Sequence, residues 1–292
     1  MDVASVCCFS WLPNISFLPW GLFPDGNRMF SPTRHGPPHR SDDEYISFRE
    51  VRDRFGFYGV KIGRWVTAQE QETAAVHFYD ALCDLMHILQ VPETVISLRE
   101  TLALHYGTGG RPGVAAHYSP QERAFALAKN AGPGSIAHEW FHAFDHYIGQ
   151  QTFSDLPAAT FASAGWLAQQ ATPVAHPLND LLFACFRSVM LDETGNSPSP
   201  QFLASAEADR RFGTLYYSQP EEMCARAFEA FVQDSTIRNN FLVKGTKQTK
   251  EARLGLYPQG EQRQNTSEAF RNYFARLGSA VERTLSAPKK QS

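Results

Sequence analysis

The sequence lacks the features that mark several large classes of protein. It contains no run of eighteen apolar residues, so no transmembrane helix is expected. Lys and Arg number 27 against 30 Asp and Glu, and this near balance gives no signal for nucleic acid or a membrane surface. No glycine-rich segment leads into Lys-Ser/Thr, so a phosphate-binding loop is not expected. No serine or cysteine nucleophile motif is present either.

Cysteine is also scarce, and its pattern argues against disulfides. The five residues are odd in number and show no metal-ligand spacing: Cys7, Cys8, Cys83, Cys185 and Cys224. The last three lie among apolar neighbours, which is typical of buried free thiols in a reducing compartment. We therefore expect a cytoplasmic protein without structural disulfides.

The chain is long enough for one good hydrophobic core, with a change of composition near its start. Residues 31–44 are rich in Pro, Ser and charge, which is typical of a linker. We predict a disordered or loosely packed N-terminal arm over 1–45, a single domain over 46–286 and a short tail over 287–292.

Apolar periodicity predicts a helix-rich α+β fold with a small antiparallel sheet. Helices are expected at 47–57, 66–90, 157–170, 177–191, 218–235 and 267–285, and strands at 93–100 and 102–107. The turn residues "SPQE" between 113–118 and 124–129 predict a β-hairpin. Thr67 and Ser135 are expected to cap the helices that follow them. Because strands are followed by helices without regular alternation, α+β is favoured over α/β.

The segment "GSIAHEWFHAFDHY" (134–147) contains an H-E-x-x-H motif. On a helix, His138 and His142 lie on one face, one turn apart, and can offer two imidazole nitrogens to one ion. Glu139 is rotated by about a third of a turn, which places its carboxylate beside the ion as a general base would be. The pattern predicts a zinc site on these residues.

A catalytic zinc site needs a third protein ligand. Ile148 occupies the position of the third histidine of a metzincin, which excludes that class. His146 lies ~12 Å along a straight helix from His138, too far for a shared ion. We therefore expect His146 or Asp145 to support the site without binding the metal.

The remaining source of a ligand is a carboxylate of "PEEMCARAFEAF" (220–231). We predict Glu222, near the start of this helix, and keep Glu221 and Glu229 as alternatives. Arg226 is expected to pair with Glu222 or Glu229. Tyr216 and Tyr217, just before the helix, are interpreted as core aromatics, with an oxyanion-stabilising hydroxyl as the alternative.

Four segments together carry a family resemblance over roughly residues 46–280: "FGFYGVKIGRWVTAQEQ", "VISLRETLALHYGTGG", "AHYSPQERAFALAKNAGPGSIAHEWFHAFDHYI" and "PEEMCARAFEAFVQD…NNFLVKGT". The chain resembles the bacterial CLCA_X family, which is related to the large polyvalent protein-associated domains of phages and conjugative elements. That family is similar to the metallopeptidase domain of the calcium-activated chloride channel regulators, which also carries an H-E-W-x-H helix. The resemblance implies a zincin-like, gluzincin-type fold, with His138 and His142 as zinc ligands, Glu139 as catalytic base and a third ligand from 220–231.

Residues and resemblance together predict a zinc metallopeptidase acting on a peptide or protein. The strand in "RAFALAK" (123–129) is expected to form the cleft edge and to bind extended substrate. A second hypothesis is a non-catalytic interaction protein of a phage, plasmid or other mobile element. Hydrolysis of a non-peptide bond is a third. No nucleic-acid or membrane partner is expected, and the sequence does not indicate an oligomeric state.

Overall fold

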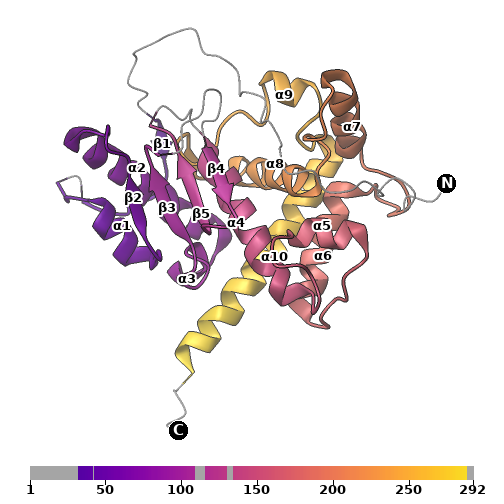
Figure 1. Cartoon of the computed structure of the whole chain (residues 1–292), viewed down its shortest axis with the longest axis horizontal. Coiled ribbons are helices and arrows are strands. Elements are labelled where there is room, and N and C mark those ends of the chain that lie inside the picture. Colours follow the sequence, from indigo (N-terminus) through magenta and orange to yellow (C-terminus); the bar gives the residue numbers. More distant parts are fainter. Residues whose placement is uncertain (1–31, 42, 109–115, 130–133, 288–292) are drawn as a thin grey trace.

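The computed structural model describes residues 32–41, 43–108, 116–129 and 134–287. Over these residues the fold is mixed α+β, dominated by helices and containing small sheets (Figure 1), which confirms the expectation of a helix-rich α+β protein. None of the helices in these ranges is long and apolar enough to cross a membrane.

The elements follow one another in the order shown in Figure 1. The helices are α1 (Phe48–Phe55), α2 (Ala68–Leu89), α3 (Glu93–Ile96), α4 (Ser135–Thr152), α5 (Ala162–Ala168), α6 (Pro177–Met190), α7 (Pro200–Phe212), α8 (Pro220–Gln233), α9 (Lys250–Arg253) and α10 (Gly260–Ser286). The strands are β1 (Arg34–His35), β2 (Val60–Ile62), β3 (Ala103–Tyr106), β4 (Ala116–Ser119), β5 (Ala124–Leu127) and β6 (Arg238–Asn239).

The larger sheet has the strand order β2-β3-β5-β4 and is mixed. The predicted hairpin is confirmed, because β4 and β5 pair antiparallel. The prediction of an antiparallel sheet is wrong, since β2, β3 and β5 run parallel. Parallel neighbours are joined by long crossovers and leave no local turn signal. The expected cleft edge is also wrong: β5, within 123–129, is an inner strand, and β4 is the edge strand beside it.

Local sequence signals set the ends of several helices. Thr67 caps α2 through a capping box with Glu70, as predicted, and α1 ends at Gly56 in the left-handed region with φ +73°. The strand predicted at 93–100 is wrong: Glu93–Ile96 form α3, and Leu98, Arg99 and Glu100 all have positive φ. Helix α7 was not anticipated, although Ser199 followed by a proline at the first turn is a helix-start signal.

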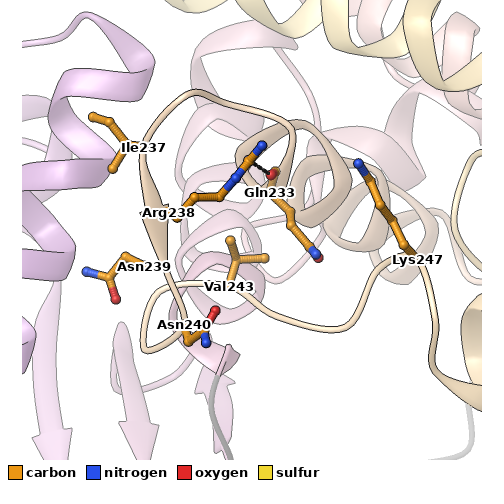
Figure 2. A pocket seen from close by; sticks show the side chains of 7 residues that line it. All are labelled: Gln233, Ile237, Arg238, Asn239, Asn240, Val243 and Lys247. Atoms are coloured by element: carbon orange, nitrogen blue, oxygen red, sulfur yellow. Dashed lines mark hydrogen bonds between the residues drawn. The ribbon is translucent and has the colours of Figure 1, made fainter. Parts of the chain in front are cut away.

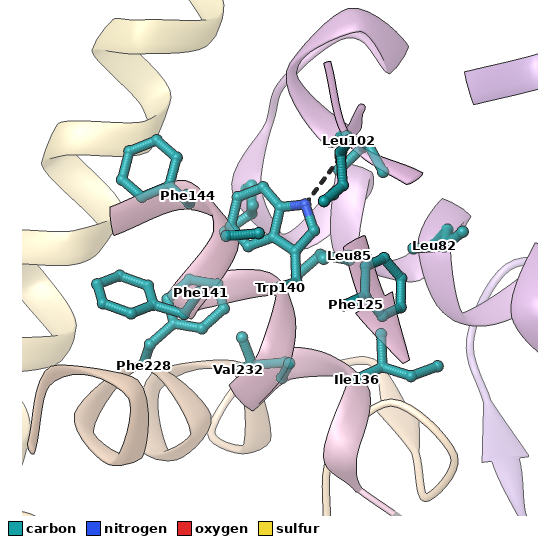
Figure 3. Packing of buried hydrophobic residues seen from close by; sticks show 14 of the residues in the cluster. Leu82, Leu85, Leu102, Phe125, Ile136, Trp140, Phe141, Phe144, Phe228 and Val232 are labelled. Carbon is teal, nitrogen blue, oxygen red and sulfur yellow. Dashed lines mark hydrogen bonds between the residues drawn. The ribbon is translucent and has the colours of Figure 1, made fainter. Parts of the chain in front are cut away.

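The aromatic core surrounds α4. Trp140 and Phe141 of α4 pack against Phe228 of α8, with ring centroids 5.6 and 4.9 Å apart, and Phe144 stacks on Trp140 at 5.5 Å (Figure 3). The indole N–H of Trp140 donates to the carbonyl of Ile96 at 2.9 Å. Helix α4 contacts β4 and β5 on one side and α5 and α8 on another. The helix that carries the motif is thereby fixed between the sheet and the C-terminal helices.

Part of the predicted N-terminal arm packs against this core. Arg34 donates through Nε and Nη2 to the buried carboxylate of Asp84 at 2.8 and 2.7 Å, and Asn239 donates to the same group at 2.8 Å. Strand β1 pairs antiparallel with β6. Because a buried carboxylate requires partners, Asp84 accounts for the packing of this segment. The packed region therefore begins before residue 46.

Candidate metal centre

The start of α4 is positioned by a distant loop. Ser135 is the first residue of the helix and not its cap, which corrects the sequence-based expectation; Gly134 is the N-cap, with φ +99°. The Ala137 N–H lies in the first turn of α4, where the helix itself supplies no acceptor, and it donates to the carbonyl of Leu242 at 3.1 Å. A side chain on Gly134 would meet the backbone of Lys244. The loop after α8 therefore replaces the side-chain cap that the sequence pattern suggested.

The structure brings the three residues predicted as metal ligands together. The Nε2 atoms of His138 and His142 lie 3.0 Å apart. Glu222 on α8 places Oε2 3.4 Å from His138 Nε2 and Oε1 3.4 Å from His142 Nε2. All three residues are buried, with exposed fractions of 5%, 7% and 8%. Their donor atoms lie within 4.8 Å of one another.

This donor set fits a zinc ion. Nitrogen and oxygen ligands bind zinc at ~2.0–2.2 Å, so tetrahedral neighbours lie ~3.4 Å apart. The separations of 3.0 to 3.4 Å between His138, His142 and Glu222 are close to that spacing. Two imidazoles and one carboxylate also match the ligand chemistry that zinc prefers in catalytic sites.

Glu229, one of the two alternative ligands, instead contacts the far side of His138. Its Oε1 accepts from His138 Nδ1 at 2.6 Å, while the hydroxyl of Tyr257 donates to its Oε2 at 3.4 Å. A carboxylate on Nδ1 fixes the imidazole tautomer that leaves the Nε2 lone pair free for a metal. Glu229 therefore has the position of an orienting residue, which sequence reasoning did not separate from a ligand position.

Arg226 pairs with Glu222, as predicted, and is almost fully buried. Its Nη2 donates to Glu222 Oε2 at 3.2 Å, and its Nη1 donates to the Tyr217 carbonyl at 3.1 Å. The guanidinium lies 5.2 and 5.3 Å from the ring centroids of Tyr216 and Tyr217. The two tyrosines thus pack around the cation, and the guanidinium fixes the orientation of Glu222.

Glu139 is buried beside the cluster, with an exposed fraction of 8%. Burial raises the pKa of its carboxyl above the usual range, while positive charge on His138 and His142 acts in the opposite direction. A carboxyl whose pKa is raised is better suited to accept a proton near neutral pH than an exposed glutamate.

Asp145 and His146 lie outside the cluster of possible metal ligands formed by His138, His142 and Glu222, which we call the donor cluster. Asp145 accepts from the backbone N–H and the hydroxyl of Ser163 at 2.9 and 2.5 Å, which ties α4 to the start of α5. His146 shares hydrogen bonds of 2.8 Å with the Tyr118 hydroxyl of β4 and the Ala158 carbonyl. Both residues therefore tie α4 to neighbouring segments, and a role in supporting the site stays a prediction.

A cavity of about 200 Å³ lies at the C-terminal end of α8 (Figure 2). It is lined by Gln233, Ile237, Arg238, Asn239, Asn240, Val243 and Lys247. Arg238 already donates to the carbonyls of Gln233 and Ser235, and Lys247 pairs with Asp234 at 2.7 Å. Since its cations are partnered and none of the donor cluster lines it, this cavity is not part of the candidate site.

Comparison with known proteins gives one match. No curated protein and no solved structure matches the chain. Residues 208–281 match the family described as large polyvalent protein-associated domain 1. The matched region includes all of α8, with Glu222 and Glu229, but not α4. The expected similarity to large polyvalent protein-associated domains is thus found over that part of the chain.

Proposed function

We propose that the protein is a zinc-dependent metallopeptidase of zincin-like, gluzincin-type fold. The observation that carries the proposal is the donor cluster of His138, His142 and Glu222, at separations suited to one tetrahedral ion, with Glu139 buried next to it. When bound, zinc supplies Lewis acidity toward a water molecule and a peptide carbonyl.

The residues of the chain then have separate roles. His138, His142 and Glu222 hold the ion, and Arg226 keeps the Glu222 carboxylate in place through its 3.2 Å hydrogen bond. Glu139 takes a proton from the attacking water and passes it to the amine that leaves. These roles require Glu222 to stay ionised and Glu139 to exchange protons. Glu222 is stabilised as a carboxylate by Arg226 and the imidazoles, whereas burial is the largest influence on the pKa of Glu139 and raises it.

The substrate is proposed to bind along β4, the edge strand of the larger sheet in the described part of the chain. Strand β4 contacts α4, and Tyr118 on this strand bonds to His146. An extended peptide can add to such an edge through main-chain hydrogen bonds, which favours a peptide or protein as substrate.

Zinc content and proteolysis test this function separately. Elemental analysis of purified wild type is expected to find about one zinc per chain, and His142→Ala is expected to lose most of it. Cleavage of casein or a peptide library is then compared with Glu139→Gln, which keeps the ligands. Unchanged zinc in His142→Ala would refute the ligand assignment. Full activity in Glu139→Gln would refute the role of the base.

A second candidate is a non-catalytic interaction protein of a mobile element that keeps the zincin-like scaffold for binding. The match of residues 208–281 to a polyvalent protein-associated family favours it. This function predicts a stable protein partner in pull-down experiments, no proteolysis, and binding that Glu139→Gln leaves intact. Zinc-dependent cleavage that is abolished by Glu139→Gln would exclude it.

A further inference from the structure

The two histidines of the cluster differ in how their second ring nitrogen is bound. His138 Nδ1 is held by Glu229 at 2.6 Å. His142 Nδ1 is buried and has no hydrogen-bond partner within the described part of the chain. A metal on Nε2 requires the proton to sit on Nδ1, where it needs an acceptor. His142 therefore needs an acceptor for its Nδ1 proton, whereas His138 already has one in Glu229.

A second buried polar atom without a partner lies on the neighbouring helix. Glu221, in the first turn of α8, has an Oε2 atom that is buried and makes no hydrogen bond to the described residues. Its neighbour Glu222 contacts His142 Nε2 at 3.4 Å, and α8 packs against α4, the helix that carries His142. A buried nitrogen on α4 and a buried carboxylate oxygen on α8 thus both lack a partner among the described residues, although the two helices pack against each other. Buried polar groups rarely stay unpaired.

Asp145 is another carboxylate of this region, about one turn after His142 on α4. Both of its oxygens already accept hydrogen bonds from Ser163, at 2.9 and 2.5 Å. These hydrogen bonds hold the start of α5 against α4, so both oxygens of Asp145 are already occupied. Glu221, in contrast, has a buried oxygen that accepts no hydrogen bond from the described residues.

We propose that Glu221 is the positioning residue of His142, accepting its Nδ1–H directly or through one bound water. The assignment rests on the proposed metal centre and extends it. Helix α8 then supplies a ligand, Glu222, and one orienting carboxylate for each histidine ligand: Glu229 for His138 and Glu221 for His142. Adjacent glutamates at 221 and 222 have different functions because successive side chains of a helix point about 100° apart.

The test measures metal affinity of the full chain, independent of any activity. Zinc dissociation constants are determined by competition with a chelating dye for wild type, Glu221→Ala, Glu221→Gln and the control Asp145→Asn. Loss of an orienting partner is expected to weaken zinc binding about 10–100-fold in Glu221→Ala. Glu221→Gln retains an acceptor oxygen and is expected to recover most of that loss. Asp145→Asn is expected to bind zinc within a few-fold of wild type.

A second readout separates positioning from a general effect on folding. In the zinc-loaded protein, the Nδ1 proton of His142 is expected to give a slowly exchanging NMR signal that shifts in Glu221→Gln and is lost in Glu221→Ala. The assignment would be overturned if folded Glu221→Ala bound zinc with wild-type affinity and the NMR signal of its His142 Nδ1 proton were unshifted. That result would leave the proposed metal centre intact. Absence of zinc binding by wild type would instead refute the proposed function, and with it the role of Glu221.

Discussion

Glu229 Oε1 lies 2.6 Å from His138 Nδ1, and the two residues are 91 positions apart in the sequence. This contact joins α8 to α4 on the side of the imidazole that faces away from the donor cluster. We expect Glu229→Ala to remove the charged acceptor of a buried nitrogen and to lower the free energy of unfolding by about 1–3 kcal/mol. Glu229→Gln keeps an acceptor and should lose less. Urea unfolding of the metal-free protein measures both, and equal stability of Glu229→Ala and wild type would contradict the role of this bond.

The buried pair of Arg226 and Glu222 predicts a large effect on stability. Arg226→Met leaves the Glu222 carboxylate with one partner fewer in a buried position, and removing one member of such a pair costs about 3–5 kcal/mol. The matched control is Arg210→Met, because Arg210 pairs with Glu207 on an exposed face of α7. That change is expected to stay within about 0.5 kcal/mol. Guanidinium unfolding of both variants checks the comparison, and similar losses at the two positions would argue against it.

Burial raises the pKa of Asp145 to about 6 from the usual 3.8. Since the folded-state value is the higher one, the stabilisation by Asp145 is complete below about pH 4 and is lost as the pH rises through about 6. Between pH 5 and pH 7.5 we expect wild type to lose about 1 kcal/mol of unfolding free energy relative to Asp145→Asn. Paired denaturation curves at the two pH values measure this difference. A constant difference, or one of opposite sign, would contradict the raised pKa.

Gly278 marks a close crossing of α10 and the end of α2. A Cβ atom at this position would collide with the carbonyl oxygen of Gln90, which has little freedom to move. We expect Gly278→Ala to destabilise the protein by about 1–3 kcal/mol. Gly59 has no atom within 4 Å of an added Cβ and no positive φ, so Gly59→Ala is a matched control without this cost. Thermal unfolding compares the two, and equal melting temperatures would show that the crossing is looser than described.

The residues of the site on α4 can be predicted from the sequence, whereas the choice of ligand on α8 cannot. His138 and His142 lie about one helical turn apart, so their spacing alone predicts a shared face, with Glu139 beside it. Glu222 is eighty residues away, and three glutamates of the same helix were candidates. Only the packing of α8 against α4 separates them: Glu222 contacts the Nε2 atoms of both imidazoles, whereas Glu229 contacts Nδ1 of His138.

The fold shows the same division between local and distant signals. The turn in "SPQE" predicted the β4–β5 hairpin, and the cap at Thr67 predicted the start of α2. The parallel pairings of β3 with β2 and β5 depend on segments far apart in the chain, and the sequence carries no local signal for them. The N-cap of α4 is missed for a similar reason, since the acceptor for its first turn is the distant Leu242 carbonyl.

The proposed metal centre is tested most directly by a crystal structure of the protein crystallised with zinc, with anomalous diffraction recorded on both sides of the zinc absorption edge. We predict a single ion within ~2.2 Å of the Nε2 atoms of His138 and His142 and of a carboxylate oxygen of Glu222. An ion bound by other residues, or no anomalous signal at this cluster at saturating zinc, would contradict the metal centre.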